Sequence, residues 1–495
     1  MQKVLVRWKF KAYNVPQVVA ILLTAIYLAA LAYIVISRIN YRYHLDWVEG
    51  VTLVQVYRIM NGQGIYTPPS LEFIPMMYPP LYFYLAAIVT KLVGFGFLPL
   101  RLVSVASTLG CMVIIYLAVK NGTCSAWLGF VGVGLFAATF RAGGAWFDIG
   151  RVDMLFVFLS LSGIYFLEKA TNWNSILAGI LFALSLLTKQ TVLPILGMAF
   201  LSILITSPRQ ALYFLAGFGI PSLVVYFILN RLTEGWYKYY LIVLPATHLI
   251  RWSAIPASLI YYLGAEVVML AVSYLPLLLG FRKVLMDKTH RHYLLTTTAL
   301  VGTSILAAIN PGAYDNSVIP AYAGLSILTG LGIGWLGSYP SPTARKTEAV
   351  LAILWLVVCI QFIQLRYDPL KQIPTHDDLK AGDTLVTELR EASGNVFIPY
   401  HNYLALYAGK KVYFDIGTYN DLAGVFATRP QPMAGQIKNR FRSTPFSLII
   451  MDDNGNSFKK AGCQNSGSIS YQSDKTFLPV TGWQIRPTNY YAQCP

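Results

Sequence analysis

Two acidic side chains stand where a membrane segment would end. In the stretch YRYHLDWVEG (41–50), Asp46 and Glu49 flank Trp47 directly after a long apolar run. Ionisable groups beside a membrane segment are costly and therefore functional candidates. A carboxylate placed there can act as a general base on an incoming hydroxyl or amine. Ordinary loop polarity is the alternative interpretation, and the spacing alone does not decide between the two.

Three further segments place polar side chains next to apolar runs. These are RAGGAWFDIGRVDML with Asp148, Arg151 and Asp153, LLTKQTVL with Lys189 and Gln190, and NPGAYDNSVIP with Asn316. Arg and Lys can hold and stabilise a phosphate leaving group. Acids and cations gathered at one membrane surface would therefore suit transfer of a group from a lipid-linked phosphate donor.

Each of these segments also has a plain structural explanation. Asp148, Arg151 and Asp153 could form a local helical ion pair, because residues three and four apart share a helix face. Lys189 could extend to the membrane interface, as lysines near helix ends do. His44 and His401 are isolated in the sequence, and we assign no metal site. The case for function depends on the segments sharing one face.

The composition indicates that membrane-spanning segments position these groups. Of the 495 residues, 56% are hydrophobic and 12% are charged, against about a quarter charged in soluble domains. Several nearly uncharged segments have the roughly 20 residues needed to cross a bilayer. The net charge of +16 fits cytoplasmic loops and membrane lipids better than nucleic acid, because no basic stripe on a soluble part is interleaved with aromatics. We predict a polytopic α-helical membrane protein.

The charge pattern predicts the topology. Lys3, Arg7, Lys9 and Lys11 precede the first apolar run, Val15 to Ile36, so the N-terminus is expected in the cytoplasm. Residues 38–80 then form the first outer loop, and the run after Pro79 and Pro80 is expected to lie along the interface. About eleven spans result, the later ones at about 100–119, 125–140, 154–168, 175–188, 190–205, 211–229, 258–280, 293–309, 317–337 and 348–365. The basic clusters 281–292 and 343–346 fall on the cytoplasmic side.

After the last predicted span the chain reads as a soluble unit. We expect a membrane domain over 1–365 and a small extracytoplasmic α/β domain over 366–495. A helical stretch, DDLKAGDTLVTELREA, precedes three strand-sized apolar runs, NVFIPY, KVYFDIG and FSLIIMDD. Cys463 and Cys494 both lie in this unit, and the sequence leaves open whether they form a disulfide.

The motifs, taken in order, resemble those of GT-C-fold membrane glycosyltransferases. The resemblance is to the family of protein mannosyltransferases and bacterial aminoarabinose transferases. Four pieces carry it: DWVEG in the first outer loop, GQGIYTPP…MYPPLYFYLAAIVTKLVG, FDIGRVDML and LLTKQTVLP. The likeness covers about residues 15–340.

The resemblance implies roles for the residues. An acid of the first outer loop, Asp46 or Glu49, would be the base, with a slight preference for Glu49 because it precedes Gly50. Arg151 and Lys189 would bind the donor phosphate. The donor or acceptor site would be shaped by Asp148, Asp153, Tyr78, Gln190 and Asn316. Tyr78 stands where some members carry a phosphate-binding lysine before the Pro-Pro pair. No cofactor is assigned, although some relatives use a divalent metal.

We therefore expect an inverting glycosyltransferase of the plasma (inner) membrane. Its donor would be a polyprenyl-phosphate sugar, and its acceptor a glycan, a lipid or a protein. A transporter or flippase for a lipid-linked or anionic substrate is the main alternative. Transporters often carry internal repeats and midplane charges, and the sequence shows neither. A membrane scaffold that works through its soluble tail is the second alternative, although that tail carries no motif that would support it.

Overall fold

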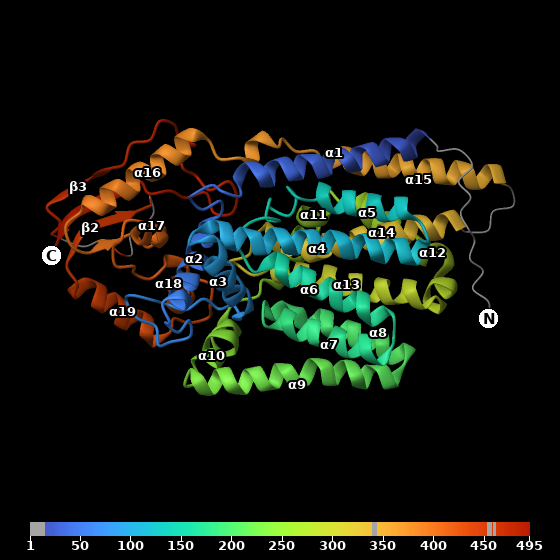
Figure 1. Cartoon of the computed structure of the whole chain (residues 1–495), viewed down its shortest axis with the longest axis horizontal. Helices are drawn as coiled ribbons and strands as arrows, with labels where there is room; N and C mark the ends of the chain where they lie inside the picture. The colour runs from blue at the N-terminus through green and yellow to red at the C-terminus, as the bar shows by residue number, and fades with distance from the viewer. Residues whose placement is uncertain (1–14, 339–343, 453–457, 459–461) are drawn as a thin grey trace.

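A bundle of helices and a smaller α/β unit make up the molecule (Figure 1). The computed structural model describes residues 15–338, 344–452, 458 and 462–495, and for residues 344–348 it describes the backbone alone. The basic residues before Val15 and the position 343 that begins the TARK cluster lie outside the described residues. The α/β unit caps one end of the bundle, and the first helix begins at the opposite end.

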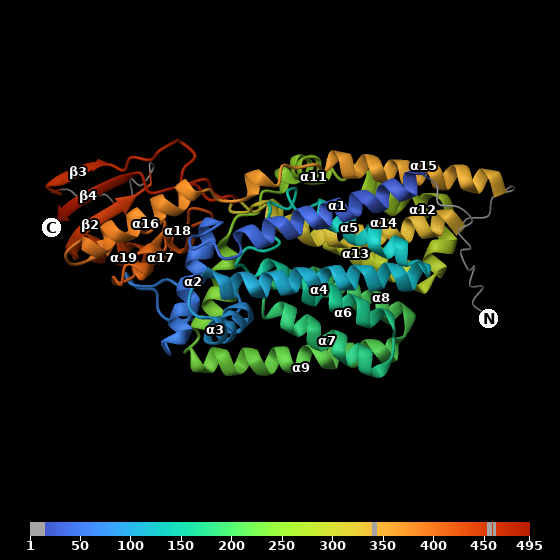
Figure 2. The ribbon, with the colours of Figure 1, turned by 45° about the horizontal axis from the view of Figure 1, so that its top comes forward.

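Most of the long helices of the bundle run close to one another along its long axis, whereas the shorter α2, Trp47–Met60, runs across it (Figures 1 and 2). The α-helices of this part of the chain follow in sequence order. They are α1 Val15–Arg38, α2 Trp47–Met60, α3 Leu81–Val93, α4 Phe97–Thr123, α5 Ala126–Ala138, α6 Asp153–Glu168, α7 Asn172–Leu186, α8 Leu193–Thr206, α9 Pro208–Leu232, α10 Trp236–Lys238, α11 Ile255–Leu263, α12 Val267–Met286, α13 Lys288–Ala308, α14 Ile319–Ser338 and α15 Ala344–Gln364. Short 3-10 helices precede α8 at Gln190–Val192 and α14 at Asp315–Val318, two more lie at Pro245–Thr247 and Trp252–Ala254, and a π-helix follows α10 at Tyr239–Val243.

Most of the predicted spans coincide with one helix each, as their apolar runs indicate. The span predicted over 258–280 is wrong in one respect, because it is two helices, α11 and α12. The break falls at residues 264–266 and contains Glu266, whose side chain is buried. The predicted outer loop 38–80 contains an unexpected helix, α2. A helix does occupy the expected interfacial stretch, as α3.

Five helices of the described chain are long and apolar enough to cross a membrane. They begin at Val15, Phe97, Pro208, Val267 and Asp315. Shorter apolar helices accompany them at 81–93, 126–138, 172–186, 190–206 and 349–364. The structure is therefore that of a helical membrane protein, and the figure of eleven spans stays a prediction.

The basic cluster 281–292 lies at the end of the bundle away from the α/β unit. Thr289 donates a hydrogen bond to Glu168, the last residue of α6, at 2.6 Å. Arg291 donates to the hydroxyl of Thr206, the last residue of α8, at 3.0 Å. Because α6 has 16 residues and rises 1.5 Å per residue, its first residue, Asp153, is about 24 Å away. The candidate site and the basic cluster thus occupy opposite ends, as the charge pattern predicts.

The C-terminal unit combines helices with a mixed sheet, as predicted. Its elements are the 3-10 helix Leu370–Gln372, α16 His376–Glu391, β1 Val396–Phe397, α17 Asn402–Tyr407, α18 Ile416–Ala423, α19 Pro432–Ser443, β2 Phe446–Met451, β3 Asn465–Ser468 and β4 Asn489–Cys494. The strand order is β1-β2-β4-β3. β1 and β2 pair in parallel, whereas β4 runs antiparallel to β2 and β3.

One predicted strand of this unit is wrong and one open question is answered. The run KVYFDIG forms no ladder: Phe414 donates one backbone hydrogen bond to Leu71 at 3.1 Å, Ile416 donates one to Pro399 at 2.9 Å, and Asp415 caps the N-terminus of α18. The run is apolar because its rings, Tyr413 and Phe414, are buried, and this burial does not require a strand. Cys463 and Cys494 form a disulfide across 31 residues of chain.

Candidate active site

The acidic motif of the first loop begins a helix. Asp46 is the N-cap of α2, with φ −130° and ψ 139°, and Glu49 lies in its first turn. An acceptor side chain followed three residues later by Glu is a sequence signature of a helix start. That signature explains the spacing of the two acids. Asp46, however, makes no capping hydrogen bond with its side chain, so its carboxylate is available for other contacts.

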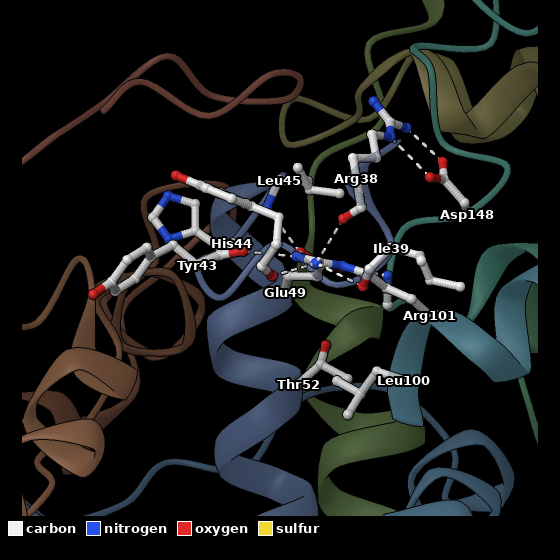
Figure 3. A network of polar contacts seen from close by, with 12 residues as sticks. Arg38, Ile39, Tyr43, His44, Leu45, Glu49, Thr52, Leu100, Arg101 and Asp148 are labelled. Atoms are coloured by element: carbon white, nitrogen blue, oxygen red, sulfur yellow. Dashed lines mark hydrogen bonds and ion pairs between the residues drawn. The ribbon is translucent and has the colours of Figure 1, made fainter. Parts of the chain in front are cut away.

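Glu49 is held from four sides in the buried network that Figure 3 shows. Its Oε1 accepts from Arg101 Nε at 2.9 Å and from the Gly150 amide at 2.7 Å. Its Oε2 accepts from Arg101 Nη2 at 2.9 Å and from the Leu45 amide at 2.8 Å. Both side chains of this ion pair are 0% exposed. Each carboxylate oxygen of Glu49 therefore already has two donors.

Arg101 is the centre of this network and the sequence interpretation missed it. It lies in the second turn of α4, inside the stretch predicted as an ordinary span. Besides Glu49, its guanidinium donates at 2.6 to 3.2 Å to the backbone carbonyls of Arg38, Ile39, Tyr41 and Tyr43. Arg101 thus fixes the turn that leads from α1 to Asp46. An Arg within an apolar span is costly unless it is paired. Its presence in the predicted span 100–119 could therefore have indicated a buried acidic partner.

Asp148 takes part in a second buried pair, beside the first (Figure 3). It accepts from Arg38 Nε at 2.8 Å, and the other carboxylate oxygen accepts from Nη2. Arg38 also donates to the Ala145 and Gln372 carbonyls at 2.8 Å each. Asp148, predicted to shape a substrate site, therefore holds the end of α1 against the loop before α6.

Four charges of alternating sign follow one another on the other side of the loop. Arg151 Nη1 donates to Asp46 Oδ2 at 3.0 Å, and Arg151 Nε lies 3.6 Å from Asp153 Oδ2. Lys189 Nζ donates to Asp153 Oδ1 at 2.6 Å. The structure thus brings together Asp46, Arg151, Asp153 and Lys189, which are 143 residues apart at the extremes of the sequence (189 − 46). We call these four residues the charge row.

The charge row opens into a small pocket at its Lys189 end. Asp153, Lys189 and Asn316 all line it, so three predicted site residues meet there. Its other lining residues include Thr191, Thr303 and Ser317. Among the described residues, the hydroxyls of Thr303 and Ser317 are buried without a hydrogen-bond partner. Unpaired buried polar groups are rare in folded proteins unless water or a ligand satisfies them.

The remaining two predicted residues support the charge row from outside. The Tyr78 hydroxyl lies 3.2 Å from Arg151 Nη2, which donates to it. Gln190 donates to the carbonyls of Met77 at 2.9 Å and Leu241 at 3.5 Å. Gln190 therefore connects the loop before Pro79 and Pro80 to the π-helix Tyr239–Val243. Tyr78 accepts a hydrogen bond from Arg151, which belongs to the charge row.

Asp46 has the properties of a base more clearly than Glu49 does. Burial raises the pKa of Asp46 to about 7, although the Arg151 guanidinium beside it acts in the opposite direction. Its Oδ1 is buried and has no hydrogen-bond partner among the described residues. A buried carboxylate oxygen that is free to accept a proton is suited to general base catalysis near neutral pH.

Two further observations concern metal ions and the histidines. Within the described ranges, no group of three or more His, Cys, Asp or Glu side chains could hold a metal ion. His44 and His401, isolated in the sequence, lie stacked with ring centroids 5.1 Å apart and an interplanar angle of 12°. This stack joins the acidic loop to the C-terminal unit.

Comparisons with known proteins relate this geometry to a fold. Residues 77–230 match a family described as dolichyl-phosphate-mannose-protein mannosyltransferase. ArnT from Cupriavidus metallidurans in the apo state is similar in structure at a TM-score of 0.54 and 11% identity, over 88% of this chain and 92% of that one. ArnT bound to undecaprenyl phosphate gives 0.54 and 10%, over 88% and 93%. AglB, an archaeal oligosaccharyltransferase from Archaeoglobus fulgidus in complex with an inhibitory peptide and a dolichol-phosphate, gives 0.53 and 10%, over 88% and 69%.

The solved structures share the fold of this chain and confirm the predicted GT-C fold. Among curated proteins, no sequence matches the chain significantly. The matched region 77–230 contains Arg151, Asp153 and Lys189, whereas Asp46 and the C-terminal unit lie outside it. At these low identities the solved structures show the fold alone. Roles for individual residues have to be argued from the geometry of this chain.

Proposed function

We propose that this protein transfers a sugar from a polyprenyl-phosphate donor to an acceptor hydroxyl or amine at the outer face of the membrane. The charge row carries the proposal. It sets an acid with a free oxygen, Asp46, beside a buried guanidinium, Arg151, at the end of an apolar bundle. The GT-C fold and the polyprenyl phosphates named for ArnT and AglB support the donor class.

In the proposed reaction Asp46 is the base. Asp46 Oδ1 takes the proton of the acceptor hydroxyl, whose oxygen attacks the anomeric carbon of the donor sugar. The bond from that carbon to the phosphate oxygen breaks, and the lipid phosphate leaves with the electron pair. A single displacement of this kind inverts the anomeric configuration. Glu49, which the sequence slightly favoured, is the weaker candidate because all its donors are already in place.

Arg151 and Lys189 would stabilise the leaving phosphate. Both cations face acids in the structure, Asp46 and Asp153, so a donor phosphate would share or replace those partners. Asp153, Tyr78 and Asn316 would orient the donor, since they contact the two cations or line the pocket beside Lys189. Asp148 and Gln190 would act indirectly, by holding the loops that carry the site.

The outer face is inferred from the two ends of the bundle. The basic cluster 281–292 lies at one end, and cations concentrate on the cytoplasmic side of membrane proteins. The site and the disulfide-containing C-terminal unit lie at the other end. Disulfides persist in oxidising compartments. Both features support a plasma-membrane protein whose N-terminus lies in the cytoplasm and whose C-terminal unit lies outside it.

The test compares Asp46→Asn with Glu49→Gln in the full chain. Release of polyprenyl phosphate from a polyprenyl-phosphate sugar is measured with purified protein. We expect Asp46→Asn to lower kcat by about 10² to 10⁴, the usual contribution of a general base. Glu49→Gln should lower the thermal stability, and the protein that remains folded should keep most of its kcat. Wild-type turnover by Asp46→Asn would refute the assignment of the base.

A further inference from the structure

The C-terminal unit reaches directly into the site through the segment Val480–Trp483. Thr481 forms an isolated parallel bridge with Asp46, and its amide donates to the Leu45 carbonyl at 3.2 Å. The Thr481 hydroxyl donates to the carbonyl of Gly144, in the loop before α6. Three contacts thus hold this segment between the acidic loop and the bundle.

Gly482 covers the free oxygen of Asp46. A Cβ added at Gly482 would collide with Asp46 Oδ1, and it would lie 3.5 Å from the ring of Trp146. The backbone of Gly482 has φ +75°, a conformation that glycine adopts without strain. Asp46 Oδ1 is therefore the atom that needs a proton donor and also the atom that the C-terminal segment screens from solvent.

Polar atoms around this contact are left without partners. Besides Asp46 Oδ1, the indole Nε1 atoms of Trp47 and Trp146 are buried and have no hydrogen-bond acceptor among the described residues. Buried Trp N–H groups usually find one. Asp46 Oδ1 and the Trp146 ring lie beside Gly482, and Trp47 packs against the adjacent Trp483. One free acceptor and two free donors around the segment form an incomplete hydrogen-bonding set, which a ligand with hydroxyl groups would complete.

Aromatic rings lie beside the same segment. Trp483 packs edge-on against Trp47 with ring centroids 5.4 Å apart, and against Tyr400 at 5.8 Å. Trp483 is 36% exposed, whereas Trp47 and Tyr400 are nearly buried. Ligand sites commonly combine aromatic walls with a few convergent polar groups. A pyranose ring has the matching character, with apolar C–H faces and a rim of hydroxyls.

We infer that Val480–Trp483 is an acceptor gate: it lies where the acceptor binds, has to move away from Asp46 for the acceptor to enter, and serves a carbohydrate acceptor. This inference rests on the proposed function and extends it to the acceptor side. When the segment moves, an acceptor hydroxyl takes the place of Gly482 at Asp46 Oδ1. The acceptor ring then lies against Trp47 and Trp483.

A first experiment uses water in place of the acceptor. Gly482→Ala forces the segment away from Asp46, and Gly409→Ala is the matched control. Gly409 also lies in the C-terminal unit at φ +71°, but a Cβ there would have no atom within 4 Å. The two variants share the backbone strain, and only one collides with Asp46.

The readouts are donor hydrolysis and amide exchange of residues 479–484 in the full-length protein. If the open state is a minor one of about 10% or less, Gly482→Ala should raise hydrolysis of a polyprenyl-phosphate sugar by about tenfold and accelerate the exchange. Gly409→Ala should change neither. Faster exchange with unchanged hydrolysis would overturn the gate. Unchanged exchange would overturn the contact on which the gate depends.

A second experiment tests the acceptor class. Oligosaccharides, a serine-containing peptide and a polyprenol lipid are offered as acceptors to the wild type, Trp483→Ala and Trp483→Phe. We expect transfer to an oligosaccharide, with the acceptor KM raised about two- to tenfold by Trp483→Ala, the range of one aromatic contact. Trp483→Phe should restore KM, and kcat should stay constant. Transfer to the peptide or the lipid alone would overturn the carbohydrate assignment.

The proposed function and the gate fail in different ways. Asp46→Asn should abolish donor hydrolysis in the wild type and in Gly482→Ala. If Asp46→Asn leaves hydrolysis intact, the base assignment fails whatever the segment does. If it abolishes hydrolysis but Gly482→Ala does not raise it, the base assignment stands and the gate alone is wrong.

Discussion

Removing Arg101 should damage this protein more than removing any exposed cation. Arg101 is fully buried and donates to both oxygens of Glu49 and to four backbone carbonyls of residues 38–43. The change Arg101→Met keeps an unbranched side chain of similar length and removes the charge and all of these donors. Glu49 would then be a buried carboxylate with two backbone donors only, Leu45 and Gly150.

The expected magnitude follows from that arrangement. Breaking a buried ion pair by removing one partner destabilises a protein by about 3–5 kcal/mol, because the other charge stays buried and uncompensated. The pair Arg42–Asp383 is a control within the same region, with side chains 52% and 48% exposed. An exposed pair contributes about 0–1 kcal/mol. The two substitutions should therefore differ by several kcal/mol.

The assay is the free energy of unfolding of the detergent-solubilised chain, compared among the wild type, Arg101→Met and Arg42→Met. A double variant, Arg101→Met with Glu49→Gln, removes the buried charge and should regain part of the loss, since the amide oxygen still accepts one backbone N–H. A loss below about 1 kcal/mol for Arg101→Met, or no recovery in the double variant, would refute the view that the pair is a buried charge clamp.

Three further predictions concern the site and the C-terminal unit. The pKa of about 7 at Asp46 means that the ionised base accumulates as pH rises through 7, so the pH–rate profile should rise there and Asp46→Asn should remove that limb. Lys189→Ala should weaken donor binding by about tenfold or more, the value of one charge-assisted hydrogen bond, with Lys189→Arg as the control; unchanged affinity would leave Lys189 as no more than the ion-pair partner of Asp153. Reduction of Cys463–Cys494, which closes 31 residues of chain, should destabilise the C-terminal unit by about 2–4 kcal/mol, seen as faster proteolysis, whereas unchanged proteolysis would show that its packing suffices.

Long apolar runs were enough to predict the bundle. A run near 20 residues has few alternatives to a helix in a membrane protein, because its backbone groups must be satisfied within the segment. The run over 258–280 failed since hydropathy averages over a three-residue break such as 264–266, which contains the buried Glu266. Strands were harder to predict. β3 and β4 exist through pairing between residues far apart. The sequence of β3, NSGS, carries little strand propensity, and in β4, NYYAQC, only the two tyrosines favour a strand.

The sequence pointed to the four residues of the charge row but not to their pairing, and it missed Arg38 and Arg101. Each motif supplied its ionisable residues, but the sequence does not say that Asp148 binds Arg38 or that Lys189 binds Asp153. The spacing of Asp46 and Glu49 does bear on where the two side chains lie. Read as a helix start, it makes Glu49 a residue that ties the first turn of α2 to the preceding loop, and it leaves Asp46 at the boundary.

Ion pairing in the charge row has a consequence for the order of events. Arg151 holds Asp46 Oδ2 at 3.0 Å while Gly482 covers the unpaired Oδ1, so neither oxygen of the proposed base is open to an acceptor before substrates arrive. A donor phosphate that attracts Arg151 would weaken the first contact, and an acceptor that displaces Gly482 would remove the second. On this reasoning each substrate frees one oxygen of Asp46, and water alone, which does neither, reacts slowly. The rate of donor hydrolysis relative to transfer measures how well that arrangement works.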